Sequence, residues 1–489
     1  MTKKIISVAI LVMMTMALLL GDHYGVLKKG RSEEEKLYED ALIIWYADSN
    51  YAEYLRDAAV SYEYETGVKV IPVEVSDVQL LEQVQKSSID GITAPDLFVM
   101  SNESLEKGVL SGICGELRDP KRVLNSAFYT DASLRAVSYR DKFYGYPLSY
   151  ETSCLVYNKT AMEQIVSTVI AKEEAGESNV EDTEGITVVE ENVAVPEIKD
   201  LSEYDKLVLD AKAKEILPTS VVGILDFANA YSLPSDVENY FLWDTKDVLY
   251  NYWFAGACLD VGGENADRNE EINIYNENAM YSLEVYQDFR NFFSMDEDSV
   301  SYEETIKQFK GRKCLFTVAG TDIVQKLEKA KSDGTFADEY DILPIGMLNG
   351  TLQSRSLSVT TMICVNGLGE HKSDAEQFAA FATHEYAPNL YARCGKMTAS
   401  HLEEYPYPQM EAIEDCYERS VFLPKMVETT NYYILAEMCF CNIWDGKDVN
   451  DELRSLSESI LKNYYGRDFV HEKIETPQVT ENYNAEDEN

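Results

Sequence analysis

The stretch from Tyr144 to Lys159 constrains the fold more than any other part of the 489-residue sequence. Leu148 and Tyr150 alternate with polar residues, and the apolar run 154–157 follows, so two extended segments are predicted. Pro147 has no backbone N–H group, so it is predicted to mark a bend or a sheet edge. Strands that join through a bend are typical of a chain that leaves one lobe and enters another. The polar and aromatic side chains of this stretch would then face a cleft between two lobes.

Length and charge limit the class of protein. One core rarely extends over 489 residues, so two or more domains or lobes are expected. The 86 Asp and Glu residues outnumber the 43 Lys and Arg residues, which gives a formal net charge of −43. Such a surface repels phosphate backbones, so no nucleic-acid partner is expected. The charge is compatible with a domain that works outside a cell, and it identifies no ligand.

The N-terminus has the layout of a secretion signal. Two lysines precede an apolar run, residues 5–20, that is also near the minimum length for a membrane span. No cysteine precedes Cys114, so a lipid anchor on a cysteine just after this run is excluded. Two outcomes stay open for residues 1–21: a cleaved signal peptide or a retained membrane anchor, followed by a tether over residues 22–40. Both place the rest of the chain at the extracellular face of the cell membrane.

Alternating strand and helix patterns predict an α/β fold. Residues 41–46 and 68–73 have strand patterns on either side of an amphipathic helix, which implies a parallel pair with a right-handed crossover. An acidic stretch, 171–200, and an acidic tail, 466–489, lack a sustained period and are predicted to be flexible and disordered. The later predicted elements are helices at 201–213, 281–293 and 301–310, strands at 221–225 and 313–318, an aromatic helical region at 237–258, and an extended segment at 340–344.

The nine cysteines are odd in number and include no C-x-x-C pair, so buried apolar thiols are expected in place of disulfides.

Standard catalytic and phosphate-binding signatures are missing, and the five histidines are not spaced as metal ligands. We therefore expect no enzyme activity, no cofactor and no metal. An extracellular glycoside hydrolase is the enzymatic alternative, and it would need two carboxylates at catalytic separation.

Short motifs follow one another over residues 41–465. They are Ile44–Asp48, Tyr64–Val70, Ala94–Phe98, Gly145–Pro147, Tyr157–Lys159 and Phe309–Phe316. In this order they resemble the extracellular solute-binding proteins of ABC transporters, family 1, the group that includes maltose-binding protein. The resemblance implies a two-lobed α/β periplasmic-binding-protein fold of type II that closes over a small molecule. Residues 41–147 and 344–390 would form the N-terminal lobe, and residues 148–343 and 391–465 the C-terminal lobe.

The resemblance also implies a set of ligand-binding residues in the cleft. It includes a first-lobe loop, a glutamate on the lobe crossing, further carboxylates and aromatic rings that could stack on sugars. For Trp253, a position in the hydrophobic core is the alternative to a position in the cleft wall. The implied residues are Asp48, Ser49, Glu103, Tyr150, Glu151, Trp253, Asp322 and Tyr432. The sequence departs from the family pattern at three positions, because Met100 and Asp322 stand where stacking tryptophans would be, and Ser104 where an arginine would be.

Two functions of different classes remain. The first is a monomeric receptor that binds a solute, expected to be a sugar or oligosaccharide, and delivers it to the permease subunits of an ABC importer. The second is a membrane-tethered sensory or scaffold protein that keeps the fold without transport. For the first, replacing Glu151 or Tyr432 by alanine is expected to weaken ligand binding without unfolding the protein.

Overall fold

The computed structural model describes residues 41–90, 94–174, 203–293 and 301–475. The predicted signal or anchor, the tether, most of the acidic stretch and the end of the tail lie outside these ranges. Among the described helices, none combines the length and the apolar character needed to cross a bilayer.

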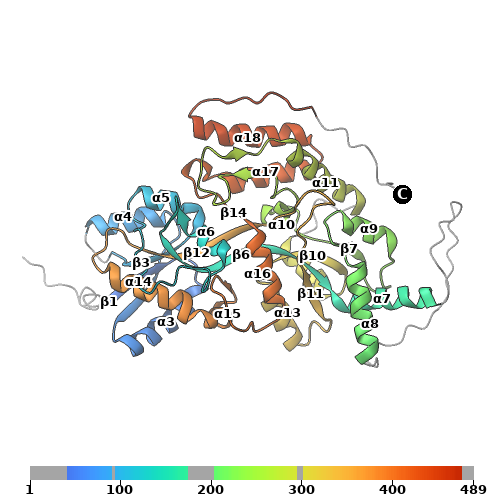
Figure 1. The fold of residues 1–489 in the computed structure, drawn as a ribbon, viewed down its shortest axis with the longest axis horizontal. Helices are drawn as coiled ribbons and strands as arrows, with labels where there is room; N and C mark the ends of the chain where they lie inside the picture. Colours follow the sequence, from blue (N-terminus) through green and yellow to red (C-terminus); the bar gives the residue numbers. More distant parts are fainter. Residues whose placement is uncertain (1–40, 91–93, 175–202, 294–300, 476–489) are drawn as a thin grey trace, which may run out of the picture.

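The molecule has two halves that share one long strand (Figure 1). This strand, β6 (Gly145–Asn158), pairs through its first part with β12 (Leu357–Val365) and β13 (Met397–Thr398). Its second part pairs with β10 (Cys314–Gly320) and β11 (Tyr340–Leu343). The mixed α/β class is therefore confirmed, and β6 is the segment that passes from one half to the other.

The first half contains the predicted strand–helix–strand unit. Strands β1 (Ala41–Tyr46), β2 (Lys69–Glu74) and β3 (Leu97–Ser101) lie parallel in the order β2-β1-β3, with β12 beyond β3. Helix α3 (Tyr51–Thr66) joins β1 to β2 and buries its apolar face, as the period of apolar residues predicts. It ends at Gly67, whose φ of 75° is the left-handed conformation that glycine adopts at low cost.

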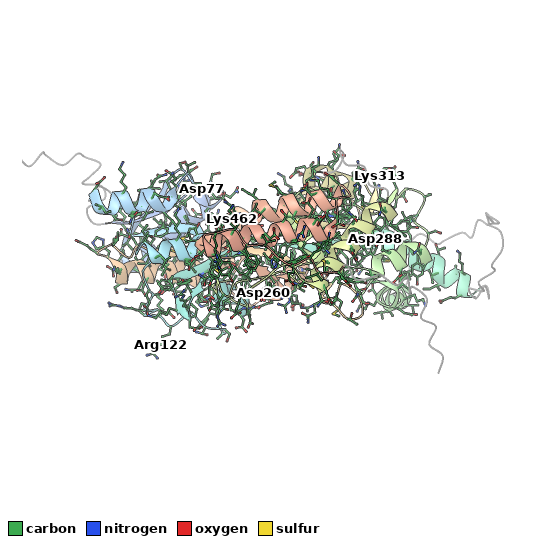
Figure 2. All side chains as sticks on the ribbon, turned by 90° about the horizontal axis from the view of Figure 1, so that it is seen from above. Asp77, Arg122, Asp260, Asp288, Lys313 and Lys462 are labelled. Atoms are coloured by element: carbon green, nitrogen blue, oxygen red, sulfur yellow. The ribbon has the colours of Figure 1, made fainter. Side chains whose placement is uncertain are left out.

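The second half is built around aromatic side chains. Strand β10 lies between β6 and β7 (Asn239–Phe241), and α11 (Glu277–Phe293), α17 (Tyr432–Trp444) and α18 (Val449–Tyr465) contribute to the same core. Seen from above, Lys462 of α18 lies over the middle of the molecule (Figure 2).

The other described helices are α4 (Leu80–Asp90), α5 (Leu105–Leu110), α6 (Asp131–Ala136), α7 (Lys159–Glu174), α8 (Glu203–Ile216), α9 (Gly223–Ala230), α10 (Val248–Asn251), α12 (Tyr302–Lys310), α13 (Ile323–Ser332), α14 (Lys372–Ala380), α15 (Leu390–Cys394) and α16 (Gln409–Arg419). The other strands are β4 (Ser138–Tyr139), β5 (Lys142–Phe143), β8 (Asp260–Val261), β9 (Ile272–Asn273) and β14 (Val421–Phe422).

The prediction of two extended segments that meet at Pro147 is wrong, because Pro147 lies inside the continuous strand β6. The pairing register between β6 and β12 shifts at this point: Thr361 faces Ser149 while Met362 faces Pro147, and Leu148 is the extra residue. A β-bulge interrupts the ladder of hydrogen bonds locally, so a residue without an N–H group is tolerated there.

Three further expectations differ from the structure. Residues 221–225 are not a strand, because helix α9 begins at Gly223 and buries Ile224 and Phe227 on one face. The region 237–258 is only partly helical, since it contains β7 as well as α10. The tail does not become disordered at residue 466, because the Ile474 N–H group donates to the Tyr275 hydroxyl at 2.9 Å. The proposed lobe boundaries stay a prediction.

Lys425 is a fully buried lysine that links the segment after β14 to α6 and β4. Its Nζ donates to the carbonyl oxygens of Arg135 at 2.6 Å and Ser138 at 2.7 Å. Burial lowers the pKa of Lys425 from 10.5 to about 7, and the Asp267 carboxylate offsets only part of this effect. The charged form of the side chain is therefore unfavourable in the folded protein near neutral pH.

We predict that the free energy of unfolding rises with pH above 7 because of Lys425. The folded-state pKa lies below that of the unfolded chain, so between the two values the unfolded chain binds more protons and loses stability relative to the folded state as pH rises. The slope from this one group is at most about 1.4 kcal/mol per pH unit. Urea unfolding at several pH values between 7 and 10 measures it, with Lys425→Met as the reference that lacks the slope. Identical pH profiles for the two proteins would contradict the prediction.

Candidate functional site

Two of the predicted carboxylates come together beside the crossing strand. Asp48 follows the C-terminal end of β1, and Glu151 lies in the middle of β6. Lys396, in the loop between α15 and β13, joins them: its Nζ lies 3.0 Å from Glu151 Oε1 and 3.3 Å from Asp48 Oδ2. The carboxyl ends of strands in open α/β sheets are common ligand sites, so the position fits a binding function.

The Lys396 ammonium is enclosed and stays charged. Its side chain is 18% exposed, and Nζ lies 5.4 Å from the centre of the Tyr51 ring. Burial alone would lower the pKa of Lys396, but the carboxylates of Glu151 and Asp48 raise it above the ordinary value. Burial also raises the pKa of Tyr51 to about 12, so this hydroxyl is neutral and can bond Ser149 Oγ at 2.5 Å.

The second half reaches the same place through the end of β10. The Thr321 hydroxyl donates to Glu151 Oε2 at 2.6 Å, so both oxygens of Glu151 are engaged. We call Asp48, Tyr51, Glu151, Thr321 and Lys396 the strand-end cluster. It combines carboxylate acceptors with ammonium and hydroxyl donors, taken from both halves of the molecule.

Asp322, also predicted from the sequence, borders the strand-end cluster. Its carboxylate accepts a hydrogen bond from the Tyr302 hydroxyl and pairs with Lys326 Nζ at 3.0 Å. Tyr302 stacks on Tyr250 with ring centres 4.7 Å apart. Burial is the main reason that the pKa of Tyr250 is raised, and the negative charges of Asp322 and Glu151 raise it further. This side of the site therefore contains an aromatic pair that the sequence analysis did not identify.

Ser49 and Glu103, two further predicted ligand residues, have different surroundings. Ser49 is next to Asp48 and belongs to the turn that starts α3, where its carbonyl accepts from Ala52 at 3.0 Å. Glu103 lies at the end of β3, accepts a hydrogen bond from Ser101 Oγ at 3.1 Å and lines a separate hollow of about 250 Å³ beside α4. Ser49 is therefore adjacent to the cluster, and Glu103 is not part of it.

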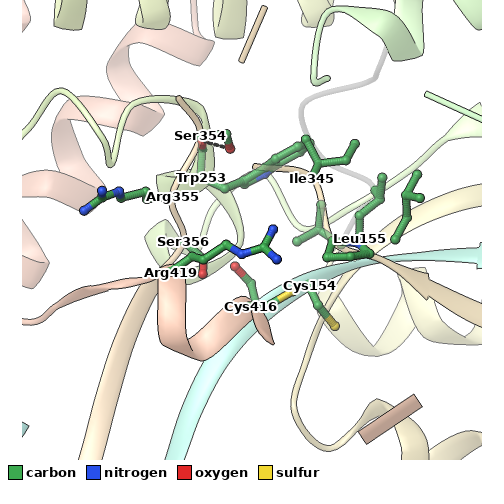
Figure 3. Close-up of a pocket in the computed structure, with 13 residues that line it drawn as sticks. Cys154, Leu155, Trp253, Ile345, Ser354, Arg355, Ser356, Cys416 and Arg419 are labelled. Atoms are coloured by element: carbon green, nitrogen blue, oxygen red, sulfur yellow. Dashed lines mark hydrogen bonds between the residues drawn. The ribbon is translucent and has the colours of Figure 1, made fainter. Parts of the chain in front are cut away.

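The three predicted aromatic ligand residues lie in hydrophobic cores. Tyr150 stacks on Tyr417 of α16 with ring centres 3.8 Å apart, on the face of β6 opposite Glu151. Trp253 packs against Ser354, whose hydroxyl donates to the Trp253 carbonyl at 2.6 Å (Figure 3). Tyr432 is buried, and its hydroxyl is 2.8 Å from that of Tyr252. A solute could reach the Tyr150 and Tyr432 rings only after repacking, whereas Trp253 lines a small pocket together with Leu155 and Arg419 (Figure 3). The roles of all three residues as ligands stay predictions.

A larger cavity of about 840 Å³ lies elsewhere, at the C-terminal end of α16. Arg135 of α6, Asp260 of β8, and Glu418 and Arg419 of α16 contribute to its lining, which includes none of the strand-end cluster.

All nine cysteines are free thiols in the structure. Five are buried, as expected for apolar packing, and four are partly exposed: Cys258, Cys394, Cys416 and Cys441. Within the ranges that the structure describes, no three His, Cys, Asp or Glu side chains are grouped as ligands for a metal ion.

Sequence reasoning missed Lys396, Tyr51 and Thr321. Lys396 follows the glycine that ends α15, and no local pattern marks it as a site residue. Tyr51 fits the buried face of α3 equally well, and Thr321 is one residue from the predicted Asp322. Only the spatial pairing with Asp48 and Glu151 brings them into the cluster.

Comparisons with known proteins give the family and the fold. A family model described as bacterial extracellular solute-binding protein matches residues 57–393. A galactooligosaccharide-binding protein of Bacillus subtilis (strain 168) is 31% identical over 132 residues, which cover 27% of this chain and 30% of that protein.

Two solved structures cover most of the chain. A cyclo/maltodextrin-binding protein complexed with maltotetraose has a TM-score of 0.65 and 15% identity over 86% of this chain and 97% of its own. The extracellular solute-binding protein from Staphylococcus aureus in complex with maltose has a TM-score of 0.65 and 16% identity over 87% and 98%. At these identities the likeness shows the fold, and it confirms the expected two-lobed α/β class. Since the family model matches most of the sequence, this chain belongs to the bacterial extracellular solute-binding proteins.

Proposed function

We propose that this protein is the receptor of an ABC importer and binds a sugar or oligosaccharide at the strand-end cluster. The observation that carries the proposal is the Glu151 carboxylate, which lies on the strand shared by both halves and contacts Lys396 and Thr321. Relatives named for galactooligosaccharide, maltodextrin and maltose binding support a saccharide as the solute.

The chemistry of the cluster suits hydroxyl groups. A sugar hydroxyl donates one hydrogen bond and accepts others, so it needs acceptors and donors side by side. Asp48 and Glu151 supply charged acceptors, and Lys396 and Thr321 supply donors. Hydrogen bonds with one charged partner are about twice as strong as neutral ones, which favours carboxylates for this task.

Closure of the two halves around the solute is the proposed working motion. Thr321 belongs to the half that contains β10, whereas Asp48 belongs to the half that contains β1. A solute that binds both would favour the closed arrangement, because it contacts both halves only there. The closed form would then dock on the permease subunits, which import the solute.

The membrane-tethered sensory or scaffold role is the second candidate. Trp253 and Tyr432 are packed in the core, and Met100 and Asp322 replace rings, so the chain presents fewer stacking surfaces than the resemblance implies. A protein that had lost transport would keep the fold and bind no saccharide. Solute binding therefore separates the two candidates.

We expect neutral oligosaccharides of the correct linkage to raise the unfolding temperature. A ligand that binds only the folded state stabilises it by about 2.7 kcal/mol at 100 times its dissociation constant. A thermal-shift screen of gluco- and galacto-oligosaccharides, followed by calorimetric titration of each hit, measures this effect. If none of these saccharides gives a shift or heat with the folded protein, the sugar-receptor function is wrong.

A further inference from the structure

Lys396 lies where a positively charged solute would be held. Its ammonium contacts carboxylate oxygens of Asp48 and Glu151 and faces the Tyr51 ring. Two carboxylates beside an aromatic face are a favourable environment for an amine, because charge–charge and cation–π attraction add. The protein itself provides the cation at this point.

The backbone around Lys396 is held on both sides. Gly395 has a φ of 67°, and a side chain there would meet the Gln325 amide of α13 at 2.3 Å. The next two residues pair with β6, with Met397 opposite Tyr150 and Thr398 opposite Ser149. Lys396 is thus directed at the carboxylates by a fixed backbone, unlike a surface lysine on a flexible loop.

Removing the positive charge of Lys396 would leave the strand-end cluster with two carboxylates and no cation. Asp48 and Glu151 would lose their shared counter-ion, and the nearby Asp322 carboxylate already pairs with Lys326 and the Tyr302 hydroxyl. In a partly desolvated site, uncompensated carboxylates attract cations strongly. With Lys396 present, the carboxylates still accept hydrogen bonds, but their charge is balanced.

We propose that Lys396 is a specificity-determining residue, an internal counter-ion that excludes cationic amines and leaves the site selective for neutral, hydroxyl-rich solutes. The proposal rests on the proposed function, because it assumes that the strand-end cluster is the solute site. It narrows the solute class: polyamines and basic peptides are rejected by charge, whereas a neutral saccharide uses the same carboxylates as acceptors.

The test compares binding of maltotriose and of spermidine by calorimetric titration of the folded chain at low salt. For Lys396→Met we expect spermidine to bind at least about tenfold more tightly than to the wild type, because two carboxylates lose their counter-ion. Lys396→Arg keeps the charge and should bind spermidine as weakly as the wild type. Lys396→Gln is a second uncharged variant, used if Lys396→Met does not fold.

Lys331→Met is the matched control. Lys331 also contacts two carboxylates, Glu339 at 2.6 Å and Glu328 at 3.7 Å, and lies over the ring of Tyr340, but it belongs to the far end of α13. If Lys331→Met gains spermidine affinity as much as Lys396→Met does, or if neither uncharged Lys396 variant gains any, the proposal is overturned.

The titrations with maltotriose and with spermidine test the proposed function and the role of Lys396 separately. Absence of binding to maltotriose and to every other neutral saccharide contradicts the sugar-receptor function, while the spermidine comparison still decides the role of Lys396. If the wild type binds a neutral saccharide and the uncharged variants gain no spermidine affinity, the function stands and the role of Lys396 is wrong.

Discussion

Glu151→Ala is expected to lower solute affinity by roughly 10- to 100-fold, because a hydrogen bond to a charged group contributes about 1.5–3 kcal/mol. The Glu151 carboxylate contacts donors from both sides of the site, Lys396 and Thr321. Its side chain is 37% exposed, so its removal leaves no large cavity in the core. Calorimetric titration with the best saccharide from the screen gives the affinity, and circular dichroism checks the fold.

Glu238→Ala is the matched control for this prediction. Glu238 also accepts from a lysine, Lys313 at 2.5 Å, but it precedes the N-terminal end of β7 and lies away from the strand-end cluster. The Glu238→Ala substitution should leave the affinity for the solute unchanged. Equal affinities for Glu151→Ala and the wild type would remove Glu151 from the site, and a parallel loss in Glu103→Ala would place solute contacts at the end of β3 as well.

Tyr432→Ala is expected to lower the free energy of unfolding by about 3–5 kcal/mol, as large-to-small changes of buried aromatic residues do. The Tyr432 ring is 1% exposed and belongs to the core of the second half, and its hydroxyl bonds Tyr252. Alanine would leave a cavity there and an unpaired hydroxyl. This expectation differs from the one that the resemblance suggests, which is weaker ligand binding without unfolding.

Urea unfolding followed by circular dichroism measures the stability of Tyr432→Ala. Tyr432→Phe separates the hydroxyl from the ring and should cost only about 1–2 kcal/mol. Tyr64→Ala is the surface control, because Tyr64 on α3 is 91% exposed and should change stability little. A Tyr432→Ala protein with wild-type stability and no solute affinity would show that the ring does contact the solute.

The sequence predicted elements well where one local pattern dominates. The β1–α3–β2 unit, α11, α12 and β10 were all placed within a few residues, because periodic burial and helix ends are encoded by neighbouring residues. Residues 221–225 show the limit of this reasoning. A short β-branched run fits a strand and a helix start equally well, and packing of Ile224 and Phe227 selected the helix.

The grouping of residues in the strand-end cluster was predicted in part. Asp48, Glu151 and Asp322 do lie near one another, because the order of motifs indicated which strand ends meet. Glu103, Tyr150, Trp253 and Tyr432 lie elsewhere, since matching a position in a family says nothing about which way its side chain packs here. The rings of Tyr150 and Tyr432 are paired with Tyr417 and Tyr252, which lie far from them in the sequence.

The amino-acid sequence by itself therefore determined the α/β class, the order of the elements and the family, because these depend on local periodicity and on short motifs in series. The tertiary structure alone decided that β6 continues through Pro147, that the aromatic residues are buried and that Lys396 lies between Asp48 and Glu151. The physical reason is that a bulge, a buried ring and a shared counter-ion each depend on partners that are remote in sequence and are brought together only by the fold.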